Sequence, residues 1–202
     1  MTKRCKLRLI RKEIFMKYYG TQLDEKAIDQ TAAMMAAAIR TAPKSCGADT
    51  LETVVVDGED KERLAEIMCV LAKETGMDFY SRDAENVRKA QCVVLAGAIA
   101  SYMATPHCSY CGMKNCGEAR ANGVTCAFSG VNLGIALGSA VSIAAGCRVD
   151  NRIMFSVGKA AIRGNFFQRK ITLAYGIPLS VSGKSIFYDR NMVSISKPIF
   201  VD

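Results

Sequence analysis

Some apolar residues of this chain recur at helical spacing and others form short continuous runs, so the sequence predicts both helices and strands. After Asp24, a residue type that caps helix starts, residues 25–40 repeat apolar positions at helical spacing. A second helix is predicted after the Asp57-Gly58 turn, and Gly76 ends it. Its apolar residues fall at i, i+3, i+4 and i+7, namely Leu64, Ile67, Met68 and Leu71.

Shorter apolar runs predict the strands. Residues 51–56 are β-branched in character, and residues 91–97 form a continuous apolar run typical of a strand buried on both faces. A short polar helix is predicted between them at 81–90. In the last third, the pattern predicts a strand at 152–157, mostly helix over 158–175 and a short strand at 178–182. The fold class is therefore α+β, with helices around a modest sheet.

The longest apolar run, residues 131–147, carries no charge but is short for a lipid bilayer. Gly134 and Gly138 lie within it at the spacing that lets two helices pack closely. We interpret the run as a buried core helix, so no membrane span is expected. Since the start of the chain also lacks the pattern of an export signal, a cytoplasmic location is predicted, where thiols stay reduced.

Length and charge suggest one domain behind a basic leader. The 202 residues fit a leader at 1–20 and a single α+β domain at 21–202, with a cysteine-rich loop at 98–128. Residues 1–17 hold seven Lys or Arg against Glu13, which accounts for +6 of the net charge of +8. The remaining +2 does not imply a nucleic-acid partner. The leader is interpreted as a solvated segment, with a binding arm as the alternative.

Four of the nine cysteines form the constellation that carries chemistry: Cys108, Cys111, Cys116 and Cys126. Their spacing, C-x2-C-x4-C-x9-C, lets one loop wrap a single centre of thiolate-bound metal. Zinc ribbons usually present two C-x2-C pairs, whereas only one is present here, so a 4Fe-4S cluster is favoured over zinc or free thiols. Gly112 and Gly117 follow two of the cysteines and let backbone N–H groups approach inorganic sulfide.

Other candidate groups are fewer. His107, the single histidine, is either a ligand or a neighbour of the cysteine site. Because the chain has one histidine, no second histidine can act as the general base of a Ser-His-Asp triad or a Cys-His dyad away from that site. Cys46 lies beside Lys44 in a loop, which is compatible with either a reactive thiol or a structural one. Cys69 and Cys92 fall on apolar positions and are predicted to be core thiols.

The segment Cys108-Ser-Tyr-Cys111-Gly112-Met-Lys-Asn-Cys116, with Cys126 beyond it, resembles the 4Fe-4S module of corrinoid iron–sulfur proteins and of electron-transport complex subunits. Its last interval is shorter than is usual there, which makes Cys126 the least certain ligand. From about residue 24 to 190 the chain resembles a family of uncharacterised ferredoxin-domain proteins of bacteria and archaea. The matching stretches are residues 38–44, 58–60, 82–87, 133–139, 150–159 and 176–180.

A weaker resemblance is to the FMN-dependent nitroreductases, whose order of helix, Ala-Pro loop, strand, helix and buried strand is followed from Ala42-Pro43 to Leu95. It implies a nitroreductase-like sheet, a homodimer and FMN at the subunit interface, with Arg40, Thr41 and Lys44 near the flavin. The chain departs from that family because it lacks the arginine-rich opening motif for the flavin phosphate. The alternative is that Arg40 and Lys44 are cations placed at a helix C-terminus.

These observations leave three functional classes. The leading one is a 4Fe-4S electron-transfer protein with an unknown redox partner. The second is a zinc-stabilised interaction domain, and the third is an enzyme, either flavin-dependent or using an open iron if Cys126 is not a ligand.

Overall fold

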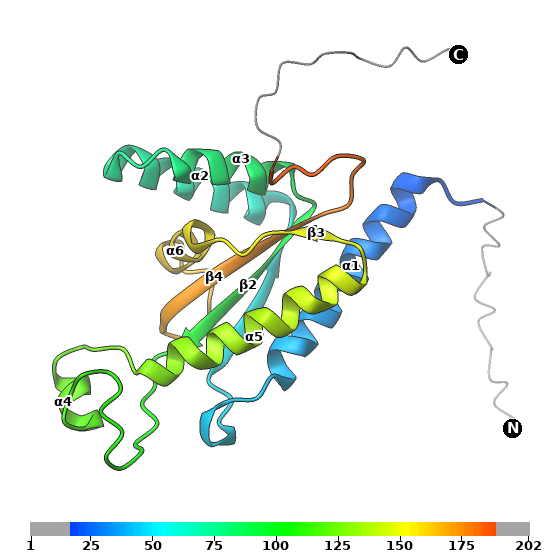
Figure 1. Ribbon diagram of the computed structural model, residues 1–202. Coiled ribbons are helices and arrows are strands. Elements are labelled where there is room, and N and C mark those ends of the chain that lie inside the picture. Colours follow the sequence, from blue (N-terminus) through cyan, green and yellow to red (C-terminus); the bar gives the residue numbers. More distant parts are fainter. Residues whose placement is uncertain (1–16, 189–202) are drawn as a thin grey trace, which may run out of the picture.

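The computed structural model describes residues 17–188. Its centre is an antiparallel sheet of four strands in the order β1-β2-β4-β3 (Figure 1). β1 (Leu51–Val56) pairs with β2 (Cys92–Ile99), β2 pairs with β4 (Ile171–Ser180), and β4 pairs with the two-residue β3 (Asp150–Asn151). The α+β class predicted from the sequence is confirmed.

Helices cover both faces of this sheet (Figure 1). α1 (Gly20–Thr41) and α5 (Ala127–Gly146) pack on one face, while α2 (Gly58–Thr75), α3 (Phe79–Lys89) and α6 (Phe155–Arg163) pack on the other. Side chains of β2 alternate between the two cores: Val94 faces α1 and α5, whereas Val93 and Leu95 face the other helices. β2 is thus buried on both faces, which explains its continuous apolar run.

The predictions for the first half of the chain are confirmed, with small shifts of the ends. The helix predicted at 25–40 begins at Gly20, the helix after the Asp57-Gly58 turn ends at Thr75, and the strand at 51–56 has the predicted bounds. Gly76 follows α2 with a φ of 66°, the left-handed conformation that ends helices at glycine.

The predictions for residues 152–175 are correct only for 158–163, which belong to helix α6 (Phe155–Arg163). The predicted strand at 152–157 is wrong because α6 begins at Phe155, and the second part of the predicted helix is wrong because β4 begins at Ile171. The short strand predicted at 178–182 is the last part of the ten-residue β4. α6 packs closely on β4, and this packing requires glycine at position 158, because a Cβ there would lie 1.8 Å from the carbonyl oxygen of Ala174.

The apolar run of residues 131–147 belongs to α5. Leu133, Ala136 and Ala140 are fully buried against the sheet and α1, which confirms the core helix. Among the described residues, α5 is the one helix with the length and hydropathy of a membrane span, although 39% of its most apolar window is buried inside the protein. Its outer face exposes Val131 and Ile135.

Candidate metal centre

The cysteine-rich loop connects the end of β2 to the start of α5 and projects beyond the end of the sheet (Figure 1). We refer to residues 100–126 as the cysteine loop. The Tyr102 hydroxyl donates a hydrogen bond to the carbonyl of Val124 at 3.0 Å, so the two ends of the loop are held together. The loop contains one short helix, α4 (Cys116–Ala121).

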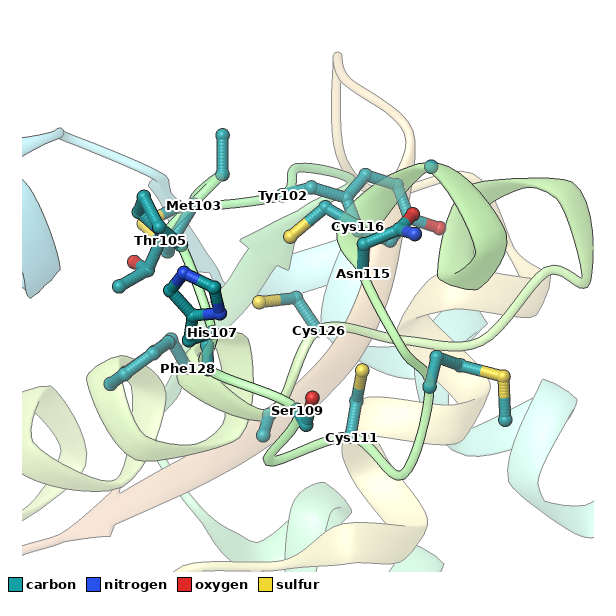
Figure 2. Close-up of a pocket in the computed structure, with 16 residues that line it drawn as sticks. Tyr102, Met103, Thr105, His107, Ser109, Cys111, Asn115, Cys116, Cys126 and Phe128 are labelled. Atoms are coloured by element: carbon teal, nitrogen blue, oxygen red, sulfur yellow. The ribbon is translucent and has the colours of Figure 1, made fainter.

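All four motif cysteines line one cavity of about 290 Å³ inside this loop. Figure 2 shows the sulfurs of Cys111, Cys116 and Cys126 turned toward its interior. Cys126 is buried, and Cys108, Cys111 and Cys116 are half-buried. The fold therefore brings thiols that are up to 18 positions apart in the sequence to the wall of one cavity.

Hydrogen bonds between side chains and the backbone shape the segment that carries Cys116. The Asn115 side chain accepts a hydrogen bond from the backbone N–H of Glu118 at 2.9 Å and caps α4. The Glu118 carboxylate in turn accepts one from the N–H of Lys114 at 2.7 Å. An Asn followed three positions later by Glu is readable in a sequence as a helix start, so this local structure was predictable although it was not predicted.

Four residues between positions 104 and 112 adopt positive φ: Ala104, His107, Ser109 and Gly112. Glycine adopts this conformation freely, but the three other residues each store of the order of 1 kcal/mol of backbone strain. Strained residues of this kind cluster in binding and catalytic loops, so the conformation marks this loop as a candidate site.

The cavity wall is mainly apolar outside the cysteines. Met103, Pro106, Met113 and Phe128 contribute to it. The ring of Tyr110 lies 5.9 Å from that of Phe128, centroid to centroid, although Tyr110 itself is 78% exposed. Such a wall restricts water, and a lower local dielectric strengthens the electrostatic effect of nearby dipoles.

The N-terminus of α5 adds positive potential at the same place. Cys126 is the N-cap of this 20-residue helix, and Ala127 and Phe128 also line the cavity. Unpaired N–H groups at a helix N-terminus carry partial positive charge, which favours thiolates and other anions beside them.

Four thiols around one cavity fit either a single zinc ion or a 4Fe-4S cluster, because both take four thiolate ligands. In a zinc site the four sulfurs bind one metal ion, whereas in a 4Fe-4S cluster each sulfur binds a different iron.

The remaining candidates lie at or away from this cavity. His107 lines it, so both roles predicted for this residue, ligand and neighbour, stay open. Cys46 is exposed in the short turn η1 (Ser45–Gly47), with a φ of 58°. Cys92 is buried in β2, and burial raises the pKa of its thiol to about 12. Cys69 is half-buried in α2.

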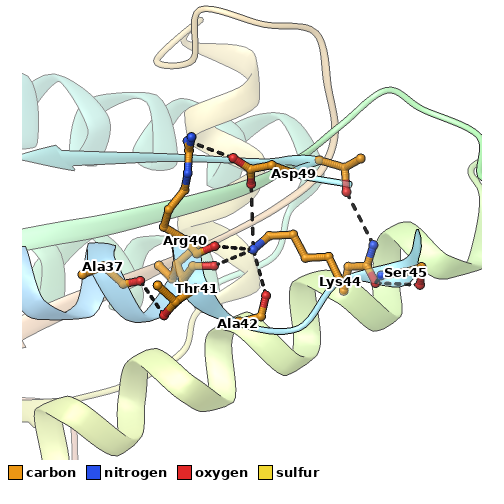
Figure 3. A network of polar contacts seen from close by, with 10 residues as sticks. Ala37, Arg40, Thr41, Ala42, Lys44, Ser45 and Asp49 are labelled. Carbon is orange, nitrogen blue, oxygen red and sulfur yellow. Dashed lines mark hydrogen bonds and ion pairs between the residues drawn. The ribbon is translucent and has the colours of Figure 1, made fainter. Parts of the chain in front are cut away.

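The three residues predicted near a flavin lie at the end of α1 (Figure 3). The Lys44 ammonium donates to the carbonyls of Ile39, Arg40 and Ala42 at 3.0, 2.7 and 3.0 Å. The Thr41 hydroxyl donates to the carbonyl of Ala37 at 3.0 Å. Both side chains are therefore engaged at the C-terminus of the helix, as expected of helix-end groups.

Arg40 differs from Lys44 because its guanidinium is largely exposed, although it is paired with Asp49 at 2.9 Å. It lines a second, more polar cavity of about 560 Å³ between α1 and the β1 edge of the sheet. The Arg40 side chain is 75% exposed and that of Lys44 is 5% exposed, so Arg40 is the predicted flavin cation that solvent and a ligand can reach.

Solved structures with a similar fold include nitroreductases. Nitroreductase CinD from Lactococcus lactis in complex with chloramphenicol aligns with a TM-score of 0.55 at 12% identity, over 87% of this chain and 89% of that chain. The FMN-dependent nitroreductase NfnB from Mycobacterium smegmatis in complex with NADPH gives 0.52 at 15% identity, over 85% and 88%. These similarities confirm the nitroreductase-like fold.

Sequence comparison gives the family. Residues 122–190 match the model of a family described as uncharacterized protein containing a ferredoxin domain. An uncharacterized protein of the archaeon Archaeoglobus fulgidus is 42% identical over 167 residues, which covers 79% of this chain and 89% of that protein. The chain therefore belongs to the family of uncharacterized proteins that contain a ferredoxin domain.

Proposed function

We propose that this protein transfers electrons through one 4Fe-4S cluster held by Cys108, Cys111, Cys116 and Cys126. The observation that carries the proposal is the single cavity that all four thiols line. Membership of a ferredoxin-domain family supports it. When bound, such a cluster accepts and releases one electron at a time.

The residues of the loop would set the properties of that site. Four thiolates supply the ligands, while the α5 N-terminus favours the resulting negative charge. Met103, Met113 and Phe128 limit the access of water to the thiolates. Tyr102 holds the segment of Cys126 against the opposite end of the loop.

Metal and sulfide analysis of protein purified without air tests the proposal. We expect about four irons and four acid-labile sulfides per chain, with visible absorption that Cys111→Ser abolishes. Cys69→Ser is the matched control, because Cys69 lies in α2 and outside the cavity. Stoichiometric zinc without sulfide would reject the proposal and support the zinc-stabilised interaction domain.

The fourth ligand needs its own variant. Cys126→Ser is expected to abolish the absorption as completely as Cys111→Ser does, if all four cysteines bind iron. An intact cluster in Cys126→Ser would instead leave one iron open, which is the arrangement that Lewis-acid chemistry requires.

A flavin site is the second candidate, favoured by the fold and by Arg40 beside the larger cavity. A guanidinium binds phosphate through two parallel hydrogen bonds. To bind the flavin phosphate in this way, Arg40 has to break its ion pair with the exposed Asp49. Titration with FMN tests this. Tight FMN binding that weakens in Arg40→Ala would support a flavin site, provided that the control Lys73→Ala, on α2, binds FMN as the unmodified protein does. Absence of FMN binding by the intact protein would exclude the flavin site.

A further inference from the structure

The cysteine loop carries an unbalanced positive charge. Among residues 100–126 the only carboxylate is Glu118, which is half-buried and hydrogen-bonded to the N–H of Lys114. Lys114 and Arg120 are exposed. Across residues 17–188, neither cation forms a salt bridge.

Two further cations join them at the base of the loop. The N–H of Ala100 donates to the carbonyl of Lys170 at 2.8 Å, which places the start of β4 beside the first residues of the loop. Arg169 and Lys170 are both exposed, and neither pairs with a described carboxylate. Glu52, the acid next to them, accepts hydrogen bonds from the N–H groups of Gln168 and Arg169. We call Lys114, Arg120, Arg169 and Lys170 the cationic rim.

The face of the sheet covered by α2, α3 and α6 carries no net charge. Residues 58–89, which include α2 and α3, hold eight carboxylates against six Lys or Arg, and α6 adds Lys159 and Arg163. The loop and the residues before β4 therefore carry a local excess of positive charge near the four cysteines. A local excess of this kind orients a charged protein as it approaches.

An exposed aromatic ring lies in the same loop. Tyr110 stands between Cys108 and Cys111 and is 78% exposed, with its ring packed against Phe128 of the cavity wall. Tyrosine of this kind is enriched in protein interfaces, because it supplies contact area at a low cost in conformational entropy.

From these observations we infer that the cationic rim and Tyr110 form the docking surface for a small electron-carrier protein with an acidic face. This inference rests on the proposed electron-transfer function and names the chemistry of its partner. A reduced carrier docked there would give one electron to a cluster held by the four cysteines and would itself be oxidised by one electron, without any covalent bond being formed.

Binding and electron transfer test the inference with two probes of opposite charge. A flavodoxin serves as the acidic carrier and cytochrome c as the basic one. We expect the full-length protein to bind flavodoxin measurably more tightly than cytochrome c in fluorescence titration. Affinity for flavodoxin should fall about tenfold or more between about 20 mM and about 500 mM salt.

Charge reversal identifies the surface. Lys114→Glu with Arg120→Glu should weaken flavodoxin binding and slow its electron transfer by about tenfold, while Lys114→Gln with Arg120→Gln gives a smaller change in the same direction. Arg4→Glu with Lys12→Glu makes the same change in net charge within the basic leader. Equal weakening by the leader variant would overturn the inference, and so would stronger binding of a short DNA duplex than of flavodoxin.

The iron and sulfide content separates the two proposals. Protein that holds its cluster but binds flavodoxin without dependence on the rim overturns the docking surface and leaves the proposed function intact. Protein without a cluster whose flavodoxin binding still depends on the rim supports the docking surface and rejects the electron-transfer function.

Discussion

The side chain of Tyr102 and the backbone of Val124 close the cysteine loop through one hydrogen bond of 3.0 Å. The two residues are 22 positions apart, and Cys108, Cys111 and Cys116 lie between them. Cys126 follows Val124 by two residues and begins α5. The hydroxyl of Tyr102 therefore links the segment of the first three cysteines to that of the fourth.

Replacing Tyr102 with Phe should shorten the lifetime of the metal centre without unfolding the protein. The ring stays in place, and the loss of one partly buried hydrogen bond costs about 1 kcal/mol, or about fivefold in an equilibrium constant. The rate at which an iron chelator bleaches the visible absorption measures this. Tyr110→Phe, in the same loop but with an exposed side chain, is the control and should bleach as the unmodified protein does.

The contrast between Cys111 and Tyr102 shows what the sequence could predict of this site. Four cysteines at close spacing identify a thiolate site on chemical grounds alone. A tyrosine six residues before the first cysteine has no such signature, because its partner is a backbone carbonyl and its role depends on how the loop closes.

The same distinction applies to the fold. The pattern of β2 identified a buried strand because both of its faces are covered. In residues 152–175 the local pattern identified helix only at 158–163 and missed the start of β4, which packs against α6 where Gly158 approaches Ala174. Contacts between segments far apart in the chain are absent from a local pattern.

Lys44 is predicted to stabilise the fold rather than to bind a ligand. Its ammonium satisfies three carbonyls at the end of α1, where the helix dipole also favours a cation. Lys44→Met should lower the free energy of unfolding by about 2 kcal/mol, measured by urea denaturation. Lys159→Met, at an exposed position on α6, should change it little. Unchanged stability together with a loss of FMN binding would assign Lys44 to the flavin instead.

Because the thiol of Cys92 is buried, we predict that the free energy of unfolding decreases at alkaline pH. Burial raises its pKa in the folded protein from 9.0 to about 12, with smaller contributions from Asp29 and Asp57. The unfolded chain therefore releases this proton first as the pH rises. Stability falls between about pH 9 and about pH 12, by at most roughly 1.4 kcal/mol per pH unit.

Denaturation at several pH values measures that effect. Cys92→Ala should flatten the stability profile above about pH 9, whatever its constant cost from the smaller side chain. Cys46→Ala is the control, because Cys46 is exposed. A slope in base that is the same in all three proteins would show that other groups cause it.

The outer face of α5 tests the predicted homodimer. Gly134 and Gly138 are exposed, and a Cβ built on either meets no atom within 4 Å. Beside them, Leu173 and Tyr175 of β4 line an apolar groove of about 310 Å³ along the helix. We propose that a second copy of the chain packs here, since small residues let two helices approach closely.

A variant with leucine at both glycine positions tests whether the protein is a monomer or a dimer that packs through this face. In a monomer the Gly134→Leu, Gly138→Leu variant should be at least as stable, because leucine is the better helix former by roughly 0.8 kcal/mol at each position. In a dimer packed on this face the added side chains force the helices apart. Sedimentation velocity should therefore show a dimer for the unmodified protein and for Lys159→Leu, and a folded monomer for the double variant. A double variant that remains dimeric would place the interface on another face of the molecule.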